Sequence, residues 1–76
     1  MDIKKFIENF YNQFDDTDFS EFSATTKFRE LYEWSSLTQL AVFNMIDRKY
    51  GKTLRFEDLY TADTIQDLYN LVILKT

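Results

Sequence analysis

The chain has 76 residues, enough for one domain, and 45% of them are hydrophobic, which is too apolar for a disordered chain. Thirteen acidic and nine basic side chains give a net charge of −4, which argues against binding to nucleic acid or to an anionic membrane. The sequence contains no Cys and no His, so it lacks thiolates, imidazole metal ligands and the usual general bases. A carboxylate-only site would need a buried pocket that a domain this small rarely builds, so we expect no metal site and no catalytic activity.

The sequence predicts an all-α domain that covers residues 1–76. It has no Pro and one Gly, and the segments between helix signals are short. The N-terminus lacks the apolar run of a signal peptide, and no stretch has the apolar length that a bilayer span requires. We therefore expect a cytoplasmic protein.

The first predicted helix carries apolar residues at steps of three and four, the pattern of an amphipathic helix. These residues are Ile3, Phe6, Ile7, Phe10, Tyr11 and Phe14. From Asp15 to about Trp34 no period persists, and we expect a long ordered loop that its aromatic side chains pin to the core. The acidic residues of this loop lack the Gly and the bidentate Glu of an EF-hand, and they favour a solvated loop over a calcium site. They are Asp15, Asp16, Asp18 and Glu21.

The second helix is predicted to begin at Ser35-Ser36, where a serine can cap the free N–H groups, and to end at Gly51. Its predicted buried stripe consists of Leu37, Leu40, Phe43, Ile46 and Tyr50. A short third helix fits residues 55–60. Asp63 or Thr64 can cap the last helix, with Gln66 or Asp67 three positions on. The apolar face of that helix is Ile65, Leu68, Tyr69 and Val72, so the expected fold is a small bundle of three main helices and one short helix.

The segment Phe28–Leu37 resembles the acyl carrier protein signature, in which a loop ending in Asp-Ser-Leu delivers a modifiable Ser to the start of the second helix. The Gly-terminated helix and the late stretch 63–68 also fall where that family places them. The resemblance implies a 4'-phosphopantetheine arm on Ser36, attached by a phosphopantetheinyl transferase. It also implies an acyl- or aminoacyl-loading ligase, downstream transferases and a monomeric carrier.

Two features depart from the family pattern. The usual Asp before the modified Ser is Ser35 here, and the customary Gly of that turn is Glu33 or Trp34. The family's acidic second helix is replaced by uncharged residues such as Thr38, Gln39 and Ala41. We therefore expect partners different from those of fatty-acid synthesis, and an acyl carrier of a specialised biosynthetic pathway.

Each candidate site residue has a second interpretation. Ser36 could be an ordinary helix cap, and a division of roles in which Ser35 caps and Ser36 is modified is also possible. For Trp34 we favour packing in the core, and the alternative is a position beside the arm. The expected partner contacts are Trp34, Leu37, Ala41 and Asn44, while Leu40 is assigned to the core.

The cargo and the function class leave alternatives open. Five aromatic residues could line an acyl cavity, but bulky rings more often fill such a space, and the cargo would then be short or polar. They are Phe28, Phe43, Phe56, Tyr60 and Tyr69. The alternatives to an acyl carrier are an aminoacyl or peptidyl carrier and an unmodified helical protein-interaction module.

Overall fold

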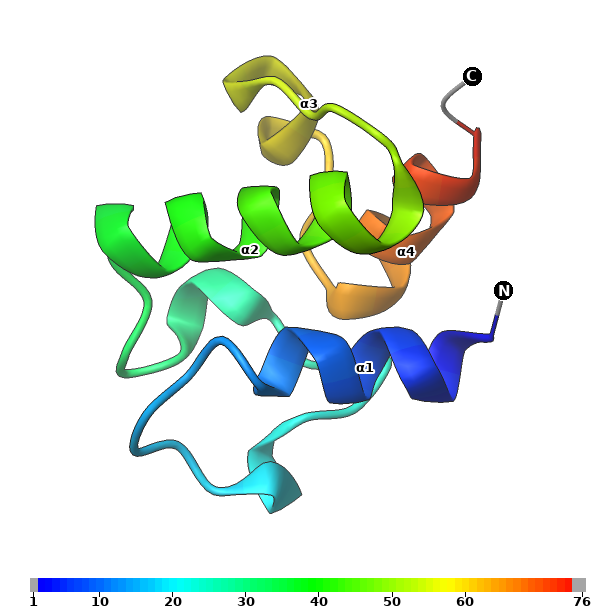
Figure 1. Cartoon of the computed structure of the whole chain (residues 1–76). Coiled ribbons are helices and arrows are strands. Elements are labelled where there is room, and N and C mark those ends of the chain that lie inside the picture. Colours follow the sequence, from blue (N-terminus) through cyan, green and yellow to red (C-terminus); the bar gives the residue numbers. More distant parts are fainter. Residues whose placement is uncertain (1, 75–76) are drawn as a thin grey trace.

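The computed structural model describes residues 2–74, which form four α-helices and two short 3₁₀ helices (Figure 1). In chain order these are α1 (Ile3–Tyr11), η1 (Phe19–Glu21), η2 (Phe28–Glu30), α2 (Ser36–Tyr50), α3 (Phe56–Tyr60) and α4 (Ile65–Leu74). The expected bundle of three main helices and one short helix is confirmed. No helix in the described part of the chain is long and apolar enough to cross a membrane.

Helix α1 begins after Asp2, whose side chain accepts a hydrogen bond from the N–H of Lys4 at 3.0 Å. It ends at Tyr11, three residues before the apolar pattern does. The reason is a tighter turn, in which the N–H of Phe14 donates to the carbonyl of Tyr11 at 2.9 Å. Phe14 is nevertheless buried, so the pattern identified a core residue that lies just outside the helix.

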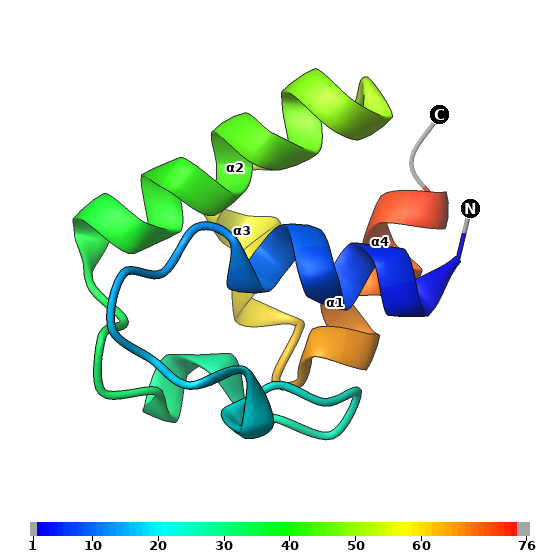
Figure 2. The same ribbon diagram turned by 60° about the horizontal axis from the view of Figure 1, so that its bottom comes forward.

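The expected loop between α1 and α2 is ordered by its aromatic side chains. It passes the end of α1 and returns to the start of α2 (Figures 1 and 2), and it contains η1 and η2. Phe14, Phe22 and Phe28 are buried, and the ring centroids of Phe14 and Phe22 lie 4.9 Å apart. Phe28 packs against Phe10 of α1 at 6.0 Å. The predicted pinning of the loop to the core is therefore confirmed, although two turns of helix within it were missed.

Helix α2 has the predicted ends, but the predicted buried stripe is wrong in its first half. Gly51 follows the helix with φ 65°, in the left-handed region that favours glycine. Leu40 was expected in the core, yet 57% of it is exposed. Ile46 is fully buried as predicted, together with Val42 and Met45, which the predicted stripe omitted. Because α2 carries apolar residues on more than one side, its spacing alone could not identify the side that faces the core.

Helix α4 is capped as the sequence predicted. The hydroxyl of Thr64 accepts from the N–H of Asp67 at 3.1 Å, and the carboxylate of Asp67 accepts from the N–H of Thr64 at 3.1 Å. The next two N–H groups, of Ile65 and Gln66, donate to carbonyl groups of the long loop at 3.0 and 2.9 Å. The loop therefore also holds the start of α4, which packs against α1.

Candidate functional site

The start of α2 presents two adjacent serines in different situations. Ser35 is the N-cap, and its Oγ accepts a hydrogen bond from the N–H of Thr38 at 3.3 Å. Ser36 is the first helical residue and is exposed, and no group within residues 2–74 is hydrogen bonded to its hydroxyl. The prediction that Ser35 can serve as the cap is confirmed. Ser36 thus has an unused hydroxyl beside N–H groups that have no acceptor within the helix.

Glu33 holds the turn that leads into these serines. Its carboxylate accepts hydrogen bonds from the N–H groups of Asp15 and Asp16 at 3.1 and 2.8 Å, and from the hydroxyl of Thr17. The Thr17 bond is the main cause that lowers the pKa of Glu33, the two N–H groups add to it, and burial opposes it. The carbonyl of Glu33 accepts from the hydroxyl of Thr38 at 2.8 Å. Glu33 therefore links the segment just after α1 to the first turn of α2.

Trp34 anchors the same turn to the core. Its ring is partly buried and lies 5.1 Å from the ring of Phe28 and 6.3 Å from that of Phe10, measured between centroids. These contacts agree with the core packing that was favoured for Trp34. The two residues before Ser35 are thus fixed by their side chains, because Glu33 is hydrogen bonded to the loop and Trp34 packs on the rings.

An open groove begins at Ser36 and runs between α2 and α3. It has a volume of about 260 Å³ and is lined by Ser36, Gln39, Leu40, Phe43 and Phe56. The rings of Phe43 and Phe56 lie 5.9 Å apart and join the two helices. The exposed part of Leu40 therefore belongs to this groove, and not to the core where the sequence placed it.

Arg29 fixes the position of α3 beside the groove. Its guanidinium group donates to the carbonyl of Leu59 at 2.8 Å and to the carbonyl of Ala62 at 2.7 Å. It also lies 3.7 Å from the carboxylate of Asp63. These carbonyls stand at and just beyond the C-terminal end of α3, where few helix donors remain, and the carbonyl of Leu59 also accepts from the N–H of Ala62 at 3.1 Å. Arg29 therefore ties η2, just before the Ser36 turn, to the far wall of the groove.

Comparison with known families identifies this arrangement. The sequence model described as the phosphopantetheine attachment site matches residues 13–72. The chain belongs to this family of phosphopantetheine-binding carrier proteins. Members of the family carry 4'-phosphopantetheine covalently on a Ser, are modified by phosphopantetheinyl transferases and interact with partner enzymes. No curated protein and no solved structure shows significant similarity to the chain.

The residues of this carrier protein around Ser36 suit such an arm. A transferase needs an accessible primary hydroxyl, and the hydroxyl of Ser36 is exposed and unbonded within the described part of the chain. The start of α2 supplies N–H groups and the positive end of a helix dipole for the phosphodiester. The groove lined by Ser36 gives the arm an apolar surface on which to lie. Once bound, the group would supply a terminal thiol at the end of a long arm.

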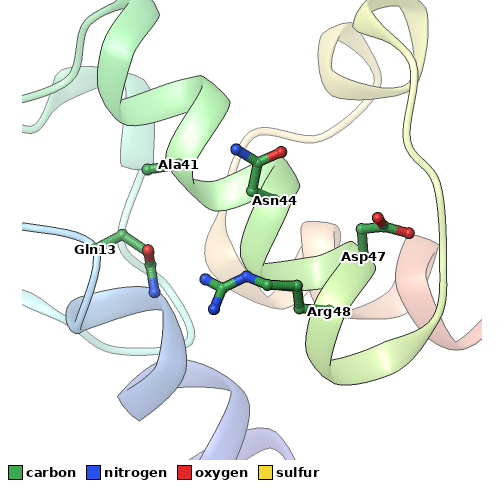
Figure 3. Close-up of a pocket in the computed structure, with 5 residues that line it drawn as sticks. All are labelled: Gln13, Ala41, Asn44, Asp47 and Arg48. Atoms are coloured by element: carbon green, nitrogen blue, oxygen red, sulfur yellow. The ribbon is translucent and has the colours of Figure 1, made fainter.

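Three of the four expected partner residues of the carrier protein lie on one face of α2, and Trp34 stands apart from them. Leu37 is 82% exposed next to Ser36, whereas Trp34 is mostly turned to the core. Ala41 and Asn44 line a different hollow of about 370 Å³ on the side of α2 that faces the end of α1. Figure 3 shows Gln13 and Arg48 pointing toward each other across this hollow. Leu37 precedes Ala41 and Asn44 by four and seven residues, so these three share one face of α2, and a different face turns Ser36, Leu40 and Phe43 to the groove.

Two residues that shape this site of the carrier protein, Arg29 and Glu33, were not predicted from the sequence. Arg29 gave no signal, because its partners lie 30 and 33 residues further along the chain. Glu33 gave a weak one, since it stands near the place where the family's turn usually has Gly. The acidic loop residues form no group of three carboxylates that could hold a metal ion within residues 2–74.

Proposed function

We propose that Ser36 carries the 4'-phosphopantetheine arm and that the protein shuttles a thioester-bound acyl group between the enzymes of a specialised biosynthetic pathway. The observation that carries this proposal is the contrast among the four serines of the chain. Ser35 uses its hydroxyl as a helix cap, and Ser23 bonds its hydroxyl to Thr25 and Thr26 at 3.1 and 3.2 Å. Ser20 lies in η1, far along the loop from the groove. Ser36 alone among them lines the groove.

The attachment step needs little from the chain itself. The Oγ of Ser36 forms a bond to the phosphorus that bears the pantetheine of coenzyme A, and the pyrophosphate P–O bond breaks. The products are the phosphodiester and adenosine 3',5'-bisphosphate, and the hydroxyl proton leaves to a base of the transferase. The chain has no His and no Cys, so it contains neither an imidazole base nor a thiol that could attack the thioester.

The surface around Ser36 supports partners other than those of a carrier with an acidic second helix. No charged residue occurs between Ser36 and Ile46. The expected contacts, from Leu37, Ala41 and Asn44 with the rim of Trp34, are apolar or uncharged. An acyl- or aminoacyl-loading ligase and downstream transferases that dock here would use shape and apolar burial. We further propose that the protein is a cytoplasmic monomer that binds these enzymes one after another.

The test is the intact mass of the protein after incubation with coenzyme A and a broad-specificity phosphopantetheinyl transferase. We expect a gain of one phosphopantetheine in the wild type and in a Ser20→Ala control, and no gain in Ser36→Ala. A gain that persists in Ser36→Ala would move the site to another serine. No gain with several transferases would favour the unmodified interaction module, with Ser36 as an exposed helix residue.

A further inference from the structure

We propose that the cargo of this carrier stays in the open groove beside Ser36, against the rings of Phe43 and Phe56. In this position it does not enter the helix bundle, which restricts the carrier to short or compact acyl groups. The inference rests on Ser36 as the attachment point, and it concerns the class of cargo that follows from it. Four observations carry it.

The first observation is the size and position of the groove. Ser36 lines it, so an arm that starts at Ser36 starts inside it. Its volume of about 260 Å³ lies below the ~300–1,000 Å³ that is typical of pockets for drug-sized ligands. Such a groove can seat part of an arm and a small group, and it is too small to enclose a long acyl chain in addition.

The second observation is that Phe43 stands between the groove and the core. The ring of Phe43 lines the groove and is also packed against the buried cluster of the bundle. Phe56 is 63% exposed and meets Phe43 with a centroid distance of 5.9 Å. A chain that moved inward from Ser36 would have to displace the ring of Phe43. The predicted set of cavity aromatics is thereby divided, because Phe43 and Phe56 line the groove whereas Phe28 is part of the core.

The third observation is the occupancy of the core cluster against which Phe43 packs. Met45, Ile46 and Leu68 have no exposed surface, and Leu59 is only 4% exposed. Side chains in such cores pack at nearly crystalline density, so a chain of several methylene groups needs a void that must first be made. The rings and aliphatic side chains of this bundle already fill the place that an acyl chain would take.

The fourth observation is that α3 is tied to η2, which restrains its movement. Opening the interior requires α3 to separate from α2, and Arg29 opposes this with its hydrogen bonds to the carbonyls of Leu59 and Ala62 at 2.8 and 2.7 Å. Hydrogen bonds from a charged donor are stronger than neutral ones. The groove therefore has a fixed far wall, and its exposed Phe56 ring offers an apolar platform for a compact group.

The experiment loads the protein with acyl-phosphopantetheine from acetyl, hexanoyl and dodecanoyl coenzyme A and confirms each loading by intact mass. The melting temperature and the amide hydrogen exchange of Ile46 and Leu59 are then measured for each species. For the wild type we expect melting temperatures within about 4 °C of one another and unchanged exchange in the core. A melting temperature that rises by more than this with chain length, together with slower exchange at Ile46, would overturn the inference.

A variant at Phe43 tests directly whether its ring keeps the cargo out of the core. Phe43→Leu removes the ring but keeps an apolar side chain, so the fold should survive where Phe43→Ala could fail. We expect dodecanoyl loading, but not acetyl loading, to raise its melting temperature by more than about 4 °C. No rise with either cargo would show that Phe43 is not the barrier. Failure of the wild type to gain mass contradicts the proposed function, whereas chain-length dependence in a loaded protein contradicts this inference alone.

Discussion

The backbone N–H of Asp16 donates a hydrogen bond of 2.8 Å to the carboxylate of Glu33, although 17 residues separate them. This bond, its neighbour from Asp15 and the bond from Thr17 fix the turn that ends three residues before Ser36. A carboxylate suits this position, because two oxygens without hydrogens can accept from several donors at once. We therefore expect the presentation of Ser36 to a transferase to depend on a side chain that does not touch it.

The substitution Glu33→Gln tests this positioning role. An amide keeps one acceptor oxygen but turns an NH₂ group toward at least one of the three donors. We expect phosphopantetheine transfer to Ser36 to slow by up to about 100-fold, because small displacements of a reacting group have effects of that size. The control is Glu30→Gln, an exposed carboxylate of η2 whose loss should leave the rate unchanged. Equal rates in wild type and Glu33→Gln would show that the turn holds Ser36 without this carboxylate.

The lowered pKa of Glu33 predicts how stability depends on pH. Folding lowers this pKa below its ordinary value of 4.5, so the ionised form stabilises the fold above that pH. The contribution is lost progressively as the pH falls from 4.5 through the pKa of the folded state. Asp67 acts in the same direction below its ordinary value of 3.8, because the N–H groups of Thr64 and Asp63 lower its pKa.

The measurement for this prediction is the urea midpoint between pH 7 and pH 3 for the wild type and Glu33→Gln. The wild-type midpoint should fall more steeply than the variant's once the pH drops below 4.5. The residual slope of the variant should reflect Asp67 and the other carboxylates. Parallel curves for the two proteins would mean that the hydrogen bonds of Glu33 contribute equally in both protonation states.

Both ends of α2 and the start of α4 could be predicted from the sequence, since local chemistry sets them. Ser35, Gly51 and Thr64 are each recognisable as capping residues, and each is one in the structure. The burial of α2 could not be predicted, because Leu40 and Val42 are equally apolar and only the packing of the other helices decides which one is covered. The bonds of Arg29 and Glu33 were equally hidden, since no local pattern reports contacts between distant residues.

The substitution Arg29→Ala should loosen α3 without unfolding the rest of the bundle. It removes the guanidinium donors to the carbonyls of Leu59 and Ala62, although the carbonyl of Leu59 keeps its bond from the N–H of Ala62. For hydrogen bonds to a charged group at a partly exposed position, we expect a loss of about 1–3 kcal/mol in the free energy of unfolding. Amide hydrogen exchange should speed up in α3 while the amides of α1 keep their relative protection.

The matched control for Arg29 is Lys27→Ala, which removes an exposed positive charge two residues away. Its free energy of unfolding should stay within about 0.5 kcal/mol of the wild type, as for most surface substitutions. If Arg29→Ala behaves like this control, the position of α3 depends on the burial of Leu59 and not on Arg29. The barrier proposed for the groove would then rest on Phe43 alone.

Leu37 should be important for transferase docking and unimportant for the fold. It is 82% exposed beside Ser36, so Leu37→Ala removes no buried contact and should leave the melting temperature unchanged. We expect kcat/KM for phosphopantetheine transfer to fall at least about tenfold, equivalent to about 1.4 kcal/mol, as for an apolar anchor at the centre of an interface. The control is Leu74→Ala, a 75% exposed leucine at the end of α4.

Because the chain carries no charge between Ser36 and Ile46, the wild-type rate should also change little when salt is raised. A steep loss of rate with salt, with Leu37→Ala as active as the control, would assign the docking to charged residues elsewhere.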